Sequence, residues 1–251
     1  MTLTNSIVRN SSSSGVRLQT SNSTLTSNTF ANNSVAAISM DLASNPTIVG
    51  VTATNNGTNA LALDAGTMVG NGFWDDPDIV YRLSGDITVT AGKTLTVGAG
   101  QIVKFRVGQA DDLLVDGTLT ANGTPALPII FTSDRDDSAG GDTNNNGLTD
   151  GNNGDWNAIN LRTGSSGHLL DNVQVRFGGS GNPAELVAAV PMTLTNSLVR
   201  NSSTSGVRLQ TSNSTLIANT FTNNLGAAIS MDLASNPAIS GVTVNNNGDF
   251  F

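Results

Sequence analysis

Two long stretches of this chain have almost the same sequence. Residues 1–57 recur as residues 192–248, shifted by 191 positions, with 11 differences over the 57 aligned positions. Self-similarity of this kind is the signature of repeat architectures, in which each unit is stacked on its neighbours. Met1 aligns with the internal residue Met192, so we expect the chain to be a segment of a longer repeat array.

A shorter period lies inside the repeated stretch. Apolar residues return every 22 or 23 positions, and pairs of them flank one polar or small residue, as in Val16-Arg17-Leu18. Alternation of this kind is typical of a half-buried β-strand. The predicted inward residues form four series: Leu3, Leu25 and Ile48; Val8, Phe30 and Ala53; Val16, Ile38 and Leu61; Leu18, Met40 and Leu63.

The stretches between these strands argue against helices, because Asn, Ser, Thr and Gly favour turns and strands over helix interiors. Leucine-rich repeats have similar periods, but they need several Leu per unit and a helical segment, which these units lack. The pattern therefore predicts an all-β solenoid with about 22–24 residues per coil. Asn10, Asn32 and Asn55 fall in register, so we expect their amides to bond along the stack.

Composition limits the partners of this segment. A net charge of −8 argues against nucleic acid, whose phosphates would be repelled. The absence of cysteine removes disulfides and cysteine-based zinc sites. No apolar run approaches the roughly 20 residues that cross a bilayer, so we expect no membrane insertion.

The ladder of apolar residues is interrupted once and the strand pattern then resumes. Phe73, Trp74 and Tyr81 mark the interruption, and strand-like runs begin again after Gly85. The predicted parts are β-helix coils at 1–63, a junction at 64–85, and a second β-helix at 86–251 that contains a loop insertion at 133–155 and the second repeat copy at 192–248.

Several runs in the second part resemble a known family. They are GDITVTAGKTLTVGAGQIVKF, LLVDGTLTANGTPALPIIFTSDRDD, GGDTNNNG, GDWNAINL and LLDNVQVRFGG. Together they resemble the right-handed parallel β-helix repeat modules of large bacterial cell-surface and secreted proteins, a pectate-lyase-like superfold, but without lyase motifs. The resemblance implies a right-handed parallel β-helix and an extracellular or cell-surface location. It implies no particular reaction, because one fold hosts many activities.

The strongest chemical motif is GGDTNNNGLTD in the predicted insertion. Oxygen ligands at loop positions 1, 3, 5 and 9, a glycine at 6 and a carbonyl at 7 suit Ca²⁺, which would pin the loop. Position 12 is Asn153 rather than a bidentate Glu, so Asp134, Asp136, Asp137 or Asp155 would have to complete the shell. A metal-free Asn/Gly turn is the alternative. The predicted Ca²⁺ ligands are Asp142, Asn144, Asn146, Leu148 and Asp150.

Polysaccharide cleavage is weighed because parallel β-helices include pectate lyases and polygalacturonases. Hydrolysis needs paired carboxylates, for which Asp75 with Asp76 and the aspartates at 134, 136 and 137 are candidates. A lyase needs a base near a metal, and Arg135 is the nominee. The only histidine, His168, lies in GSSGHLL, without the acid and base context of such enzymes. We therefore predict that the segment is not an enzyme.

Two further surface patterns have simpler explanations. Thr-x-Thr pairs at 88/90, 94/96 and 118/120 suggest an ice-binding array of hydroxyls, but the pairs are not expected to recur at one solenoid position. Ordinary β-propensity on solvent faces explains them. Phe73, Trp74 and Trp156 could stack on sugars, although packing at the junction is the simpler use.

A solenoid end exposes unpaired strand edges and an open apolar cross-section. The second copy ends at Asp249-Phe250-Phe251, before a counterpart of residues 60–63. We expect the ends to be covered by flanking repeats of the same protein or by identical subunits stacked head to tail into a filament. The predicted function is a non-catalytic structural or adhesive segment of a large extracellular bacterial repeat protein. The alternative is a carbohydrate-binding or polysaccharide-cleaving β-helix, with a surface polysaccharide as partner.

Overall fold

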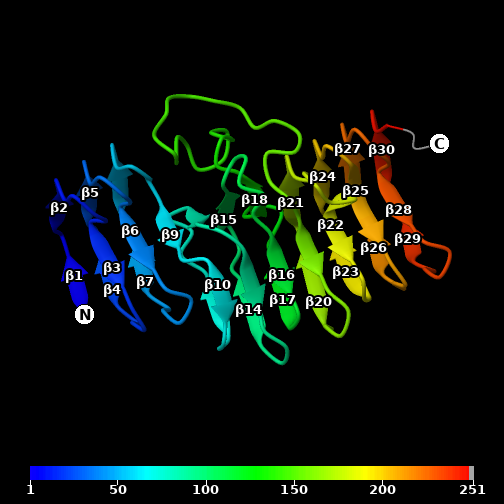
Figure 1. The fold of residues 1–251 in the computed structure, drawn as a ribbon, viewed down its shortest axis with the longest axis horizontal. Helices are drawn as coiled ribbons and strands as arrows, with labels where there is room; N and C mark the ends of the chain where they lie inside the picture. The colour runs from blue at the N-terminus through cyan, green and yellow to red at the C-terminus, as the bar shows by residue number, and fades with distance from the viewer. Residues whose placement is uncertain (249–251) are drawn as a thin grey trace.

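The computed structural model describes residues 1–248 and forms an elongated stack of parallel β-strands (Figure 1). Residues 249–251, with which the second copy ends, lie outside this described part. The chain winds as a right-handed β-solenoid with about 23 residues per turn, which confirms the predicted fold. No helix capable of crossing a membrane occurs in residues 1–248.

One sheet runs the whole length of the rod, and we call it the spine sheet. Each of its strands hydrogen-bonds to the corresponding strand of the next coil. Its strands are β3 (Val16–Leu18), β6 (Ile38–Met40), β9 (Leu61–Leu63), β12 (Tyr81–Leu83), β15 (Ile102–Phe105), β18 (Ile129–Ser133), β21 (Val173–Arg176), β24 (Leu198–Arg200), β27 (Thr220–Thr222) and β30 (Thr243–Asn245).

Two short side sheets complete the first three coils. One contains β1 (Thr2–Thr4), β4 (Thr24–Thr26) and β7 (Thr47–Val49). The other contains β2 (Ile7–Arg9), β5 (Thr29–Ala31) and β8 (Thr52–Thr54).

Two longer side sheets complete the remaining coils. The first contains β10 (Gly66–Met68), β13 (Ile87–Val89), β16 (Leu113–Val115), β19 (Ile159–Leu161), β22 (Ala184–Ala188), β25 (Ser205–Leu209) and β28 (Ile229–Met231). The second contains β11 (Gly72–Trp74), β14 (Thr94–Val97), β17 (Thr118–Asn122), β20 (His168–Asp171), β23 (Met192–Thr195), β26 (Thr215–Ile217) and β29 (Ala238–Ser240).

Two of the three sheets are interrupted after the third coil, so β7 and β8 have no strand above them. The interruption precedes the coil β10-β11-β12, which lies in segment 64–85. Of its three strands only β12 pairs with a strand of the first three coils, namely β9. On the free edge of β7, Ile48 N–H donates to Asp76 Oδ1 and Gly50 N–H donates to Asp78 Oδ2, both at 2.7 Å. These carboxylates satisfy backbone donors that would otherwise lack a neighbouring strand.

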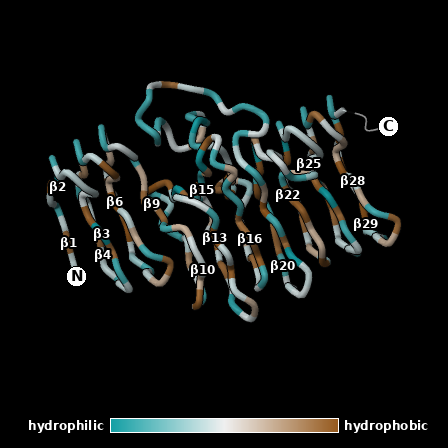
Figure 2. Tube along the Cα trace, viewed as in Figure 1, coloured by the Kyte–Doolittle hydropathy of each residue, from teal (hydrophilic) through white to brown (hydrophobic). Residues whose placement is uncertain are grey.

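The predicted inward residues form the core. Eight of the twelve are buried, and the other four are half-buried and pack against the same cluster. Figure 2 shows hydrophobic positions spread along the strands, whereas the long insertion is mostly hydrophilic. The half-buried four are Leu3, Val8, Val16 and Ala53.

The predicted side-chain ladder of Asn10, Asn32 and Asn55 is wrong by one position. These three residues have positive φ angles of 61°, 55° and 53° and form the bend itself. Asn tolerates this left-handed conformation better than most residues, which explains its recurrence there.

The amide ladder is made by the asparagines that follow the bend. Asn33 Nδ2 donates to Asn56 Oδ1 at 2.8 Å, and Asn224 Nδ2 donates to Asn247 Oδ1 at 2.7 Å in the second copy. Each amide also donates to a main-chain carbonyl, as Asn33 does to Val8 O at 3.2 Å. These inward side chains therefore bond coil to coil where the backbone turns.

The two repeat copies occupy different sheets. β3 of the first copy lies in the spine sheet, but its counterpart β25 lies in a side sheet, and the counterpart of β2 is the spine strand β24. From β1 to its counterpart β23 the chain advances seven coils and one further strand. The second copy is therefore rotated by one of the three strand positions about the rod axis.

Candidate functional site

The outer face of the spine sheet carries a row of basic side chains, which we call the basic row: Arg82, Lys104, Arg176 and Arg200. Arg82 is in register with Lys104 on neighbouring strands, and Arg176 is in register with Arg200. Thr132 of β18 is paired with Lys104 and separates the two halves of the row. Alternation along each strand places these side chains on the same face of the sheet. Because neighbouring strands are about 4.8 Å apart, residues in register on them lie close together.

The long insertion, residues 134–158, joins β18 to β19 and folds over the basic row. Figure 1 shows it as the large green loop beside β15 and β18. Its contact is close at Gly140 (φ 71°), where an added Cβ would lie 2.4 Å from a methyl group of Val80. The ion pairs that hold it join Asp134 to Arg82 at 2.9 Å, Asp136 to Arg176 at 3.1 Å, and Asp137 to Lys104 at 4.0 Å.

Asp136, one of the aspartates weighed as a catalytic group, is buried in a network of donors. Thr132 Oγ1 donates to its Oδ2 at 2.7 Å, and Ser138 Oγ donates to its Oδ1 at 2.5 Å. Burial alone would raise the pKa of Asp136, but these hydrogen bonds and the charge of Arg176 together lower it. The carboxylate is therefore held ionised as a structural acceptor at neutral pH.

Lys104 is the most deeply buried cation of the basic row, with a side chain 0% exposed. Its Nζ donates to the carbonyl oxygen of Gly141 in the insertion at 2.9 Å. Burial lowers the pKa of Lys104 to about 8, against the opposing charges of Asp137 and Asp136. A neutral amine is therefore reached at a lower pH than for an exposed lysine.

The predicted calcium loop forms a turn held by its first residue. Asn146 N–H donates to Asp142 Oδ1 at 3.0 Å, and Gly147 N–H donates to Asp142 Oδ2 at 2.9 Å. Leu148 is 90% exposed at the tip. Within residues 1–248 no three His, Cys, Asp or Glu side chains converge as a metal site. Calcium binding by the predicted ligands of this loop, the carboxylates of Asp142 and Asp150 included, stays a prediction.

Asn144 and Asn146 line a polar cavity of about 410 Å³ between the insertion and the spine sheet. The Oδ1 atom of Asn144 is buried and has no hydrogen-bond partner among the described residues. Three arginines share the lining, so the cavity combines guanidinium groups with amides. The other lining residues are Arg82, Arg106, Val107, Gln109, Asp134 and Arg135.

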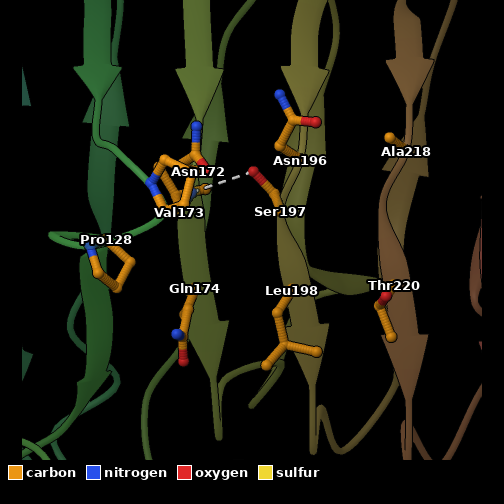
Figure 3. Close-up of a pocket in the computed structure, with 10 residues that line it drawn as sticks. Pro128, Asn172, Val173, Gln174, Asn196, Ser197, Leu198, Ala218 and Thr220 are labelled. Atoms are coloured by element: carbon orange, nitrogen blue, oxygen red, sulfur yellow. Dashed lines mark hydrogen bonds between the residues drawn. The ribbon is translucent and has the colours of Figure 1, made fainter.

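An open groove of about 310 Å³ runs across the spine sheet at the amino-terminal ends of its strands, whereas the basic row lies toward their carboxyl-terminal ends (Figure 3). Gln174, Leu198 and Thr220 form its floor, in register on β21, β24 and β27. Figure 3 shows Asn172, Asn196 and Ala218 in a second line at the bend, with Pro128 at the side. The lining combines three amide side chains and two hydroxyls with apolar side chains and carries no charged group, which suits uncharged polar ligands.

His168 is buried and neutral. Leu119 N–H donates to its Nδ1 at 3.2 Å, so Nε2 carries the proton and donates to Ser165 Oγ at 2.9 Å. Burial lowers the pKa of His168 to about 4. The ring therefore acts as a bridge between coils.

Among the other residues considered from the sequence, Asp76, Trp156 and Arg135 have structural contacts, whereas Phe73 is 41% exposed. Asp76 accepts the Tyr81 hydroxyl at 2.7 Å in addition to the backbone of β7, whereas Asp75 is exposed. Trp156 is buried, stacks on Phe105 at 3.9 Å and donates to a main-chain carbonyl. Arg135, the nominee for a lyase base, lies 3.4 Å from Asp155.

The expectation that Thr-x-Thr pairs do not recur at one solenoid position is wrong for two of the three pairs. Thr94 is in register with Thr118, and Thr96 with Thr120, on neighbouring strands β14 and β17. The array ends in the next coil, where Thr120 faces Leu169. Two adjacent rungs are too few to form an extended hydroxyl surface.

Two buried charged side chains, Lys104 on the spine sheet and Glu185 on a side sheet, were not predicted from the sequence. Lys104 lies in QIVKF at an outward position, where alternation predicts a solvated charge, and Glu185 lies in AELVA at a similar position. Both are completely covered, Lys104 by the insertion and Glu185 by the segment around Gly178, whose N–H donates to its carboxylate. The available signal for Lys104 was the aspartate-rich insertion after β18, the strand that pairs with β15 in the next coil.

Comparison with protein families agrees with this architecture. Residues 1–91 match the family model described as "Right handed beta helix region", and residues 73–149 match the one described as "Pectate-lyase like beta helix domain". No curated protein and no solved structure matches the chain. The stacked parallel coils and the two overlapping matches, which together span residues 1–149, agree on a right-handed parallel β-helix repeat, and the second match is consistent with the pectate-lyase-like type.

Proposed function

We propose that the chain is a non-catalytic structural or adhesive segment of a large extracellular bacterial repeat protein, in which it acts as a rigid spacer or stalk. The ten-stranded spine sheet is the observation that carries the proposal, because one continuous hydrogen-bonded ladder links every coil along the rod. The polar Ser, Thr and Asn surface and the net charge of −8 suit a soluble extended segment.

The candidate catalytic aspartates are occupied by ion pairs and hydrogen bonds, which supports a non-catalytic role. Asp134, Asp136 and Asp137 face cations of the basic row, and Asp76 caps a strand edge. A glycosidase instead keeps two carboxyl groups free on either side of a scissile bond. Incubation with polyuronides, with and without Ca²⁺, should yield no unsaturated or reducing products; release of either at a protein-dependent rate would refute this role.

A carbohydrate-binding or polysaccharide-cleaving β-helix is the second candidate, and the groove floored by Gln174, Leu198 and Thr220 favours it. The repeat supplies a matched control, because Ile7 is the counterpart of Leu198 on a face without the Pro128 wall. A glycan bound in the groove should be lost in Leu198→Asp and retained in Ile7→Asp. Equal binding by both variants in a surface-polysaccharide array would exclude the groove.

The proposed partners at the rod ends are flanking repeats of the same protein or identical subunits stacked head to tail. The strand edges of the first and last described coils support this, together with the exposed apolar residues Ile7, Met231 and Val244. Parallel edges can continue a ladder in only one polarity, which gives an open filament rather than a closed ring. Sedimentation over a wide concentration range should show growth beyond the monomer, and a constant monomer mass would restrict the partners to flanking repeats.

Calcium is the proposed ion of the 142–150 loop, with the role of fixing the insertion. Support comes from the turn around Asp142 and the unpartnered amide oxygen of Asn144. Isothermal titration should show a saturable site that is lost in Asp142→Asn and kept in Asp116→Asn, a control outside the insertion. Absence of heat with the unaltered chain would assign the loop to a metal-free turn.

A further inference from the structure

Lys104 and Asp137 meet in the interior between the spine sheet and the insertion. Nζ of Lys104 lies 4.0 Å from Oδ1 of Asp137, and the two side chains are 0% and 4% exposed. That oxygen is buried and has no hydrogen-bond partner among the described residues. A buried ion pair without a direct hydrogen bond recovers little of its desolvation cost, so electrostatic stability alone does not account for the pair.

We propose that the side chains of Lys104 and Asp137 condense to an isopeptide bond that ties the insertion covalently to the spine sheet. Lys104 is fixed on β15, and Asp137 is fixed in the insertion. The bond would link two segments that the fold brings together across 33 residues of sequence. It concerns the covalent state of the chain and stands independently of the proposed spacer role.

The surroundings of Asp137 prepare its carboxyl group for attack. Thr149 N–H donates to Oδ2 at 2.7 Å, and Asp137 N–H donates to Thr149 O at 3.2 Å. Oδ2 is therefore the oxygen that would carry negative charge in a tetrahedral intermediate, with a backbone donor already in place. Oδ1, which faces Lys104, is the free oxygen and the one that would leave.

The nucleophile is oriented as well. Lys104 Nζ is anchored by its hydrogen bond to Gly141 O at 2.9 Å, which limits its rotation. The complete burial of the Lys104 side chain disfavours the charged ammonium form, which promotes proton transfer to Asp137. Reacting atoms about 3–3.5 Å apart are in a near-attack arrangement, so Nζ, which lies 4.0 Å from Oδ1, has to move closer to Cγ before it attacks.

The condensation balances without another reactant. Proton transfer within the ion pair gives a neutral amine and a neutral carboxylic acid. Nζ then attacks Cγ of Asp137, the N–C bond forms, and the bond from Cγ to Oδ1 breaks. Oδ1 leaves as water with the acid proton and one amine proton. The product is a secondary amide, and the site excludes the bulk water that would favour its hydrolysis.

Intact mass under denaturing conditions tests the proposal on the chain itself. The expected mass is one water molecule below that of the sequence, and tandem mass spectrometry should find one branched peptide that contains both Lys104 and Asp137. The variants Lys104→Met and Asp137→Ala should each have the full mass. The variant Lys93→Met, which alters the only other lysine, should keep the loss.

A full mass for the unaltered chain overturns the proposal, whatever the variants do. So does a water loss that maps to a linear peptide, for example to a succinimide at Asp116-Gly117. Because the intact mass of the unaltered chain is measured without any substitution, a variant that fails to fold does not weaken the test. Loss of water in the unaltered chain and in Lys93→Met, but not in Lys104→Met, supports the bond.

Discussion

At the scale of single residues, the environment of a side chain in this rod depends on which segment covers it. His168, Lys104 and Glu185 are all buried polar groups on or beside strands, and each is satisfied differently. His168 accepts a backbone N–H and donates to a serine, Lys104 meets the insertion, and Glu185 accepts the Gly178 N–H at 3.0 Å. Groups of this kind link folding stability to pH.

His168 should make the fold sensitive to mild acid. Its pKa is about 4 in the fold and ordinarily 6.5, so the unfolded chain takes up a proton in this interval while the folded chain does not. Stability is therefore lost as pH falls from about 6.5 to 4, by up to about 3 kcal/mol. Urea unfolding at pH 7 and pH 4.5 should show a steeper loss for the unaltered chain than for His168→Gln. The chain has one histidine, so equal slopes would remove His168 as the cause.

Glu185 should act in the opposite direction. Burial raises its pKa well above 4.5, and the charge of Arg200 and hydrogen bonds from Gly178 and Arg200 only partly offset this effect. The folded chain retains the proton that the unfolded chain releases, so stability falls as pH rises above about 4.5. Glu185→Gln should remove this slope and be more stable than the unaltered chain at pH 8. The exposed Asp150→Asn serves as control, and an unchanged slope in Glu185→Gln would contradict the assignment.

At the scale of elements, a strand edge that loses its neighbour needs other acceptors, and Asp76 provides one for β7. Asp76→Ala should destabilise the fold by about 1–3 kcal/mol, because it leaves Ile48 N–H and the Tyr81 hydroxyl unsatisfied in a buried position. Asp75→Ala, at the exposed neighbouring position, should change stability by less than about 0.5 kcal/mol. Denaturant unfolding of the two variants measures the difference, and similar costs would show that the cap is unimportant.

Elements with local, periodic signals could be predicted from the sequence, and contacts between distant segments could not. The inward series from Leu3 to Leu63 follow from period-2 alternation repeated at each coil. The amide ladder was placed one residue too early because both coils contain Asn-Asn, at 32–33 and 55–56, and only the backbone bend decides which side chain turns inward.

The candidate site was harder to predict for the same reason. Lys104 is outward by alternation, and its burial depends on a loop that begins 30 residues later. The aspartates of that loop were recognised as a cluster, but pairing with Arg82 and Arg176 requires the register of the spine sheet. The recurrence of Thr94 with Thr118 also required knowledge of the register, which depends on coil length as well as composition.

At the scale of the whole molecule, the two repeat copies allow nearly identical sequences to be compared in two structural contexts. They share nearly the same sequence and both lie near an end of the described rod, but their connections differ. The only strand pairing between the first three coils and the rest is that of β9 with β12, whereas the coils of the second copy continue upstream through all three sheets. Rotation by one strand position also places the same outer residues on different faces, so a shared surface motif would be displayed in two directions.

The difference in connection predicts that the first copy opens before the second. In a quasi-one-dimensional solenoid, each coil is stabilised by its neighbours, so an interface with one continuous sheet is weaker than one with three. Amide hydrogen exchange should be faster for residues 2–49 than for their counterparts 193–240. The near-identity of the peptides makes intrinsic exchange rates closely comparable.

Fraying from an end predicts a gradual rise in protection along the rod, whereas a weak interface predicts a step. The step should fall between β9 and β12, and Asp76→Ala should accelerate exchange throughout residues 2–49 while leaving 193–240 unchanged, because the carboxylate caps only the edge of β7. Equal protection of the two copies, or acceleration of both by the substitution, would mean that the spine sheet alone couples the coils as strongly as three sheets do.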